Sequence, residues 1–170
     1  MTWFEAAWFF LPAGVANMAP VLASRLPLLR AWNTPLDLGI TLNGKRLFGD
    51  NKTIRGIVAG VLAAVTVAAL QASFFNVGVT PSIAVAALLG LGALSGDALK
   101  SFFKRQLNIR PGSSWFPFDQ LDYVIGGLAF AALLQPISLL FGLQVAVIYF
   151  TLHLIVSYIG YLLGLKRTPI

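Results

Sequence analysis

The charged residues of this 170-residue chain are confined to three short polar segments, and this distribution constrains the fold more than any other feature. All twelve Lys and Arg, and five of the six acids, lie in or beside residues 25–55, 97–122 and 166–167. Residues 56–96 and 123–165 contain no acid, Lys or Arg. Charged residues make up 11% of the chain, against about 25% in a typical soluble domain. The expected solvent for such a chain is the bilayer rather than water.

We therefore predict an all-α polytopic membrane protein that forms a single domain over residues 1–170. A transmembrane helix needs about 20 apolar residues. On that basis the sequence predicts five spans, at residues 3–24, 54–74, 83–102, 119–141 and 144–165. The two larger loops then cover residues 25–53 and 103–118, and Thr53 is expected to cap the second helix.

The orientation of the spans follows from the positive charges. Every Lys and Arg falls on one side of the predicted spans, and the opposite loops, near residues 76 and 142, contain none. Positive charge gathers in cytoplasmic loops, so five spans place the N-terminus outside and the C-terminus inside. The net charge of +6 then faces anionic lipid and an anionic substrate at the cytoplasmic side of the plasma membrane, and nucleic acid is not an expected partner.

Asp97 begins the strongest polar motif. Lys100 and Lys104 follow it at i+3 and i+7, so the three side chains share one helix face. An Asp at the centre of a bilayer costs about 2.5–3.5 kcal/mol, which favours a functional reason for its presence. The alternative is that Asp97 simply pairs with Lys100 or Lys104.

Asp119 and Asp122 form a second acidic motif at i and i+3 of the next predicted helix. Two carboxylates on one helix face are able to share a cation, and Mg²⁺ prefers a few carboxylates completed by water and phosphate oxygens. The alternative is a role at the helix N-terminus, where Asp is favourable, and it explains Asp119 better than Asp122. Together with Asp97, these residues form a candidate magnesium site.

The third motif covers residues 43–53, which are rich in Gly, Asp and Asn. These residue types favour a tight turn whose backbone amides face an anion, and a helix start directly afterwards suits phosphate. Lys45, Arg46 and Lys52 add positive charge, although an ordinary basic loop would look similar. The inventory of all three motifs indicates Mg²⁺, a polyphosphate and a membrane substrate. His153, the only His, is more typical of a packing residue than of a catalyst.

These motifs resemble those of the archaeal CDP-archaeol synthase family, in the same order and over essentially the whole chain. The resemblance lies in residues 44–53, in Gly96-Asp97 with the Lys and Ser that follow, and in the pair Asp119 and Asp122. The wider CDP-diacylglycerol synthase (phosphatidate cytidylyltransferase) family shares the Ser-x-x-Lys-Arg element at residues 101–105. That family has a His-Gly-Gly run where this chain has residues 113–118, a difference that favours the archaeol branch.

The resemblance implies Mg²⁺-dependent transfer of CMP from CTP to a lipid phosphate such as 2,3-di-O-geranylgeranylglyceryl phosphate. It assigns metal binding to Asp97, Asp119 and Asp122, and catalysis to these carboxylates with Lys100 and Lys104. The implied CTP-binding residues are Lys45, Arg46, Gly49, Asp50, Asn51, Lys52, Thr53 and Arg105. The implied partners are CTP, the lipid phosphate and the bilayer.

Two other functions fit part of the pattern. A small transporter for phosphate-bearing solutes would use intramembrane Asp and basic loops. Transporters, however, place charge on both access paths, whereas one face of this chain has none. A non-catalytic scaffold would leave the three Asp residues without a role.

Overall fold

The computed structural model describes residues 2–75, 77–110 and 112–164, and within these residues the chain is almost entirely helical apart from its loops. The expected all-α class is confirmed, with one small hairpin in addition. In chain order the elements are α1 (Trp3–Arg25), α2 (Pro27–Arg30), β1 (Thr41–Leu42), β2 (Lys45–Arg46), α3 (Ile54–Phe74), α4 (Ile83–Gln106), α5 (Phe118–Ala131) and α6 (Leu139–Leu162).

Four helices in the described part of the chain are long and apolar enough to cross a membrane, namely α1, α3, α4 and α6. The protein is an integral membrane protein, as the charge distribution predicts. The count of five spans and their orientation remain predictions. Lys166 and Arg167, which contribute to the predicted charge asymmetry, lie outside the described residues.

The fourth predicted span, residues 119–141, is not one continuous helix. α5 ends at Ala131, residues 132–138 form turns and irregular backbone, and α6 begins at Leu139. Pro136 explains the break, because proline lacks a backbone N–H and disfavours helical geometry in the residue before it. The 14 residues of α5 reach about 21 Å, short of a hydrocarbon core about 30 Å thick. The apolar composition of this stretch concealed the break.

In the described chain, a side-chain cap lies at the N-terminus of each of the four long helices α1, α3, α4 and α6. The Thr53 hydroxyl accepts a hydrogen bond from the Gly56 amide at 3.1 Å, which confirms the predicted cap of α3. Ser82 and Ser138 cap α4 and α6 in the same way. α1 continues as one helix through Pro12. These caps fix where each helix begins, and so they fix which side chains its first turn presents.

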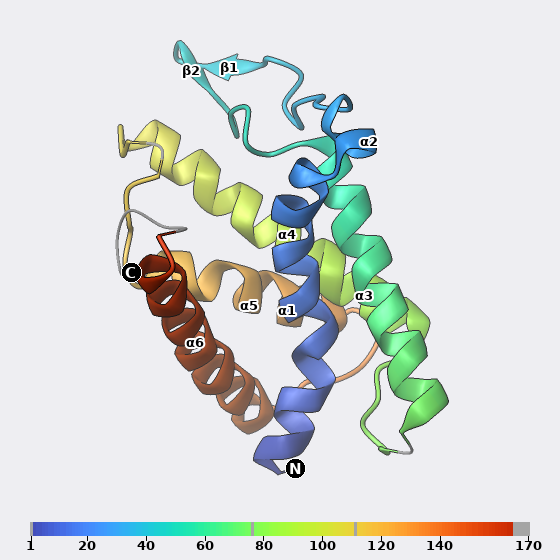
Figure 1. The fold of residues 1–170 in the computed structure, drawn as a ribbon. Helices are drawn as coiled ribbons and strands as arrows, with labels where there is room; N and C mark the ends of the chain where they lie inside the picture. The colour runs from blue at the N-terminus through green and yellow to red at the C-terminus, as the bar shows by residue number, and fades with distance from the viewer. Residues whose placement is uncertain (1, 76, 111, 165–170) are drawn as a thin grey trace.

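α1 lies at the centre of the bundle and contacts α3, α4, α5 and α6. Figure 1 shows the hairpin of β1 and β2, together with α2, gathered at one end of the molecule, beyond the end of α1 and the start of α3. Since α1 and α4 end there and α3 begins there, the described basic residues gather at this end: Arg25, Arg30, Lys45, Arg46, Lys52, Arg55, Lys100, Lys104, Arg105 and Arg110. We call this the basic end. Glu5 lies at the opposite end of α1.

α4 and α5 approach each other through three glycines. A Cβ atom on Gly92 would lie within 3 Å of the Gly126 backbone, and one on Gly96 would lie within 3 Å of the Asp122 backbone. Small residues let helix backbones approach this closely in membrane proteins. This contact holds the acidic start of α5 against the last turns of α4.

Replacing Gly92 with Ala should overpack the contact between α4 and α5 and lower the free energy of unfolding by about 1–3 kcal/mol. The measurement is a lower thermal unfolding midpoint in detergent. Gly78→Ala is the matched control, because a Cβ there would meet no atom within 4 Å. An unchanged midpoint for Gly92→Ala would show that the two helices are not tightly packed.

The loop between α2 and α3 folds around the carboxylate of Asp37, which is fully buried. Arg46 donates to its two oxygens at 2.5 and 3.2 Å, and the backbone amides of Phe48 and Gly49 each donate to it at 2.9 Å. The Gly39 amide donates at 3.2 Å. Amides of the segment 43–53 were predicted to face a bound anion, but two of them face this internal carboxylate instead.

The hairpin is attached to α4 as well as to Asp37. Asn43 and Gly44, with φ of 51° and 75°, form the two-residue turn between β1 and β2, and Asn-Gly is the pair that such turns favour. The Lys45 ammonium donates to the Gln106 carbonyl at the end of α4, at 2.8 Å. The loop therefore has a fixed position over α4.

The Arg46 guanidinium is the main cause of the low pKa of Asp37, which lies well below its ordinary value. Burial opposes this effect by raising the pKa, and the amides of Gly49, Phe48 and Gly39 add to the lowering. The same ion pair raises the pKa of Arg46. Because the folded-state pKa of Asp37 is depressed, its stabilising effect is complete above the unfolded-state pKa of about 3.9 and is lost as pH falls towards the folded-state value.

Asp37→Asn should therefore lower the stability of the protein at pH 7 by about 1.5–3 kcal/mol, the range for hydrogen bonds to charged groups. The difference in free energy of unfolding between the variant and the wild type should stay constant above pH 5. It should shrink as the pH falls below about 4. Thermal unfolding at several pH values measures both effects.

Asp50→Asn is the control, since the Asp50 side chain pairs with the same Arg46 but is 78% exposed. Removing the Asp50 carboxylate should lower the free energy of unfolding by less than about 1 kcal/mol. Equal losses in the two variants would contradict the central role of Asp37.

Candidate active site

Three carboxylates converge on the ammonium group of Lys100. Its Nζ lies 3.1 Å from Asp97 Oδ1, 3.1 Å from Asp119 Oδ1 and 2.7 Å from Asp122 Oδ2. The Lys100 side chain is 15% exposed and that of Asp122 only 6%. The two predicted acidic motifs, which lie on different helices, thus form one cluster.

Two further lysines complete the charge balance of this cluster. Lys52, from the loop before α3, pairs with the second oxygen of Asp97. Lys104 contacts both oxygens of Asp119, at 2.7 and 2.9 Å. Three ammonium groups therefore face three carboxylates. The simple pairing of Asp97 with Lys100, held open by the sequence, does occur, but as one contact of a larger network.

Helical spacing explains the local geometry. Asp97 and Lys100 lie one turn apart on α4, and Asp119 and Asp122 lie one turn apart on α5. Although it makes no side-chain cap for the helix, Asp119 lies in the first turn of α5, as the alternative interpretation of this motif requires. Its carboxylate accepts a hydrogen bond from the Trp115 amide of the preceding loop at 2.5 Å. Asp122 has no such role at the helix start.

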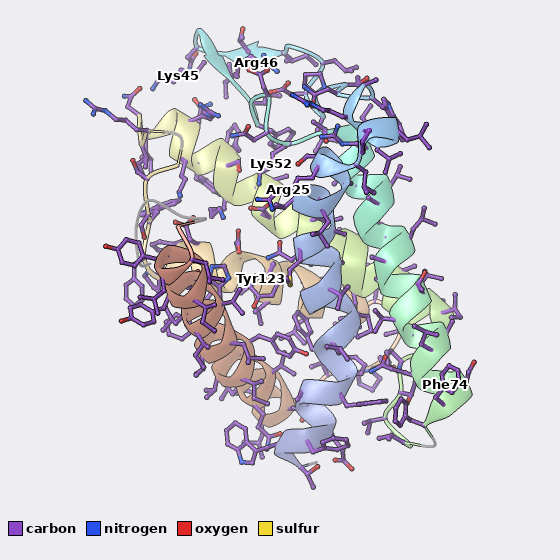
Figure 2. All side chains as sticks on the ribbon, in the orientation of Figure 1. Arg25, Lys45, Arg46, Lys52, Phe74 and Tyr123 are labelled. Atoms are coloured by element: carbon purple, nitrogen blue, oxygen red, sulfur yellow. The ribbon has the colours of Figure 1, made fainter. Side chains whose placement is uncertain are left out.

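A charged cavity of about 150 Å³ lies beside the cluster, between the loop before α3 and the end of α4. The residues that line it are Phe48, Asn51, Lys52, Lys100, Ser101, Lys104, Arg105, Ile109 and Gly112. Figure 2 labels Lys52 in this region, between the hairpin end of the loop and the body of the bundle. Among the described residues, four cationic side chains and no carboxylate line it, which suits a polyphosphate anion.

The structure brings some predicted CTP-binding residues to this cavity and leaves others away from it. Asn51, Lys52 and Arg105 line it. Gly49 lies under the Arg105 guanidinium, and a Cβ at Gly49 would come within 3 Å of that group. Thr53 does not line this cavity, and its hydroxyl caps α3.

Lys45, Arg46 and Asp50 also lie away from the cavity lining. Lys45 donates a hydrogen bond to the end of α4, and Arg46 forms an ion pair with Asp37. The exposed Asp50 pairs with Arg46 at 2.9 Å. Their observed contacts shape the loop.

Asp37, Ser101 and Ile109 were not among the predicted site residues. Asp37 organises the loop, and the other two line the cavity. The sequence held a signal for Asp37, because Asp followed two residues later by Gly favours a turn closed by the Asp side chain. Ser101 begins the Ser-x-x-Lys-Arg element that carries part of the resemblance, and that element was the available signal for it.

His153 does not line the charged cavity. With Asn17 and Tyr123 it lines a separate cavity of about 210 Å³ between α1 and α6. The His153 and Tyr123 rings lie 5.9 Å apart. Figure 2 shows Tyr123 in the space between these two helices. A packing role for His153 agrees with this position.

Within the part of the chain that the structure describes, no group of three or more His, Cys, Asp or Glu is arranged to hold a metal ion. The Lys100 ammonium stands where the carboxylates of Asp97, Asp119 and Asp122 converge. The donors themselves are hard oxygens, the type that Mg²⁺ prefers. Asp122 Oδ2 is buried, and the Lys100 ammonium, 2.7 Å away, is its partner among the described residues. The donor chemistry therefore fits magnesium.

Comparison with known proteins identifies the family. Residues 1–170 match the profile of the CarS-like family, CDP-archaeol synthase. The CDP-archaeol synthase of Methanospirillum hungatei is 39% identical over 160 residues, which cover 87% of this chain and 96% of the relative. That of Thermofilum pendens is 42% identical over 163 residues, covering 94% of this chain and 77% of the relative.

A solved structure of an intramembrane enzyme for archaeal membrane lipids biosynthesis has a similar fold. Its TM-score is 0.77 and its sequence identity 33%, over 92% of this chain and 94% of the other. These matches support an enzyme rather than the transporter or scaffold that the sequence left open. The chain belongs to the CDP-archaeol synthase family.

Proposed function

We propose that this protein transfers CMP from CTP to an isoprenoid glycerol-lipid phosphate, such as 2,3-di-O-geranylgeranylglyceryl phosphate. The products are a CDP-archaeol-type lipid and pyrophosphate, and the reaction takes place at the cytoplasmic face of the plasma membrane. The observation that carries this proposal is the cluster of three carboxylates around Lys100, beside a cationic cavity at the basic end of the bundle.

CTP binds in the charged cavity. Lys52, Lys104 and Arg105 line it and face the triphosphate, while the Asn51 amide offers hydrogen bonds to the nucleotide. The remaining loop residues of the predicted set, Lys45, Arg46, Gly49, Asp50 and Thr53, act mainly by holding the loop in place, as their contacts suggest.

Charge balance supports a divalent cation. The three carboxylates of the cluster offset its three ammonium groups, so Lys52, Lys104 and Arg105 together neutralise only part of the charge of a triphosphate. Asp97, Asp119 and Asp122 would hold Mg²⁺, which neutralises the charge of the triphosphate and of the departing pyrophosphate. Lys100 then remains beside the reacting groups as a second source of positive charge.

The reaction needs positioning more than proton transfer. An oxygen of the lipid phosphate attacks the α-phosphorus of CTP, and the bond to the bridging oxygen of pyrophosphate breaks, so that pyrophosphate leaves with the electron pair. A phosphate monoester is already an anion near neutral pH, since its second pKa is about 6. Lys100 and Lys104 stabilise the negative charge that moves from nucleophile to leaving group.

Asp122→Asn should lower kcat for CMP transfer by about 100-fold or more, the usual loss when one preorganised charge-stabilising group is removed. The assay follows α-labelled CTP into lipid with purified protein in detergent, and it compares an ether-linked isoprenoid glycerol phosphate with phosphatidic acid. The variant should still fold, because Asn has nearly the same shape as Asp and Lys100 keeps Asp97 and Asp119 as partners.

Glu5→Gln is the control, since it removes a carboxylate from the opposite end of α1 and should leave transfer unchanged. Full activity of Asp122→Asn would contradict its place in the active site. If more label is transferred to phosphatidic acid than to the ether-linked isoprenoid glycerol phosphate, the proposed class of lipid substrate is wrong.

Chelation of divalent cations should abolish CMP transfer, and added Mg²⁺ should restore it. Ca²⁺ should restore it poorly, because Ca²⁺ takes six to eight ligands at longer distances than the compact shell of Mg²⁺. The measurement is pyrophosphate release at increasing Mg²⁺ concentration after dialysis against EDTA. Unchanged release in EDTA would rule out the metal role of the three carboxylates.

A further inference from the structure

An exposed apolar patch lies where α1 ends and α2 begins. Leu28 is 90% exposed, and Leu26 and Trp32 are exposed near it in the chain. Two exposed arginines, Arg25 and Arg30, alternate with these apolar side chains. We call these five residues the α2 patch. Apolar side chains that are exposed together and rimmed by charge mark a contact with a partner or with a membrane.

The backbone of α2 is attached to α3, so the α2 patch has a fixed direction. The buried Arg55 side chain, in the first turn of α3, donates from Nη1 to the carbonyls of Leu29 and Arg30 at 3.1 and 3.3 Å. Figure 1 shows α2 beside the end of α1 and the start of α3, closer to the bundle than the hairpin is. The exposure of Leu28 is therefore built into the fold.

The α2 patch continues the apolar side of α1. Met18, Val21 and Leu22 are exposed, and their spacing of three and four residues places them on one side of that helix. Leu26 follows Leu22 by four residues, directly after the end of α1. Because α1 is apolar and long enough to span a membrane, this side faces hydrocarbon. The α2 patch then lies where the hydrocarbon ends.

We propose that the α2 patch lies in the headgroup region of the bilayer and binds anionic phospholipid there. Its two leucines and Trp32 enter the edge of the hydrocarbon, where indole rings are favoured. Arg25 and Arg30 meet the lipid phosphates, and each basic residue near an anionic surface strengthens binding by up to about fivefold. This inference goes beyond the proposed reaction and does not depend on it.

The charge around the α2 patch favours this occupant. Arg25 and Arg30 form no ion pair with an acid of the described chain, and residues 6–36 contain no acid. The next acid along the chain, Asp37, is buried and paired with Arg46. Arginine pairs well with phosphate. A second copy of the chain that met this patch symmetrically would instead bring like charges together.

A single fluorescent label tests the contact, since the chain contains no Cys. Leu28→Cys is labelled with bimane and reconstituted into vesicles of phosphatidylcholine and phosphatidylglycerol, either of which carries brominated chains. Bromine quenches the fluorophore on contact, and iodide does so from water. We expect strong quenching by both brominated lipids and weak quenching by iodide. The affinity for phosphatidylglycerol at this position should exceed that for phosphatidylcholine at least fivefold.

Two other labelled positions calibrate the result. Asp50→Cys carries the label at a 78% exposed position of the same loop, and iodide alone should quench it. Leu62→Cys carries it on the exposed side of α3, about two turns beyond Arg55. Both brominated lipids should quench that label equally, because no arginine of the α2 patch lies beside it.

Removal of the arginines tests the lipid selectivity. Arg25→Gln/Arg30→Gln in the labelled Leu28→Cys protein should bring the preference for phosphatidylglycerol close to one, and added salt should weaken the preference of the parent. Arg110→Gln, at an exposed position after α4, is the matched control and should leave the preference unchanged.

Three results would overturn the proposal. Quenching of the label at position 28 by iodide alone would place the α2 patch in water. A label shielded from iodide and from brominated lipid would indicate contact with a second copy or with another protein. Equal affinity for the two lipids, or a preference that survives in Arg25→Gln/Arg30→Gln, would show that the arginines do not select anionic phospholipid.

Discussion

The contact of one ammonium group with three carboxylates organises the rest of this structure. Lys100 lies within 3.1 Å of Asp97, Asp119 and Asp122, in a place with little exposure to solvent. Carboxylates crowded in such a place repel one another and lose hydration, so a shared cation is needed to hold them together. The glycine contact between α4 and α5 makes the arrangement possible, because any larger side chain at Gly96 would separate the two helices.

The loop before α3 supplies the second half of the site, and it depends on a different buried charge. Asp37 gathers the amides of Phe48 and Gly49 and the Arg46 guanidinium, and so fixes the loop. The loop then delivers Lys52 to Asp97. Two separate networks, one in the bundle and one in the loop, thus meet at Asp97, and the charged cavity lies between them.

This arrangement suits a reaction whose substrates come from different phases. A nucleotide approaches from water, where cationic side chains of the loop and of α4 face it. A lipid approaches from the bilayer, and its phosphate has to reach the same cations. Lys100 lies on the boundary, because it lines both the charged cavity and a mostly apolar cavity between α4 and α5, where Leu99 and Phe130 also lie. Membership of the CDP-archaeol synthase family agrees with this division, since its product joins a nucleotide to a lipid.

The sequence alone was sufficient for the membrane class, for the bounds of α3 and for the shared face of Asp97 and Lys100, because hydropathy and helical spacing act over a few residues. It was also sufficient to suggest the family, because each motif that carries the resemblance is a short, contiguous run of residues. It was insufficient for the end of α5 at Ala131, where an apolar stretch hides the effect of Pro136. For Asp37 it indicated at most a local turn, and it did not indicate the pairing of Lys52 with Asp97 across 45 positions. Those features arise only when packed helices bring distant charges together, because a buried charge takes whichever partner the tertiary structure places beside it.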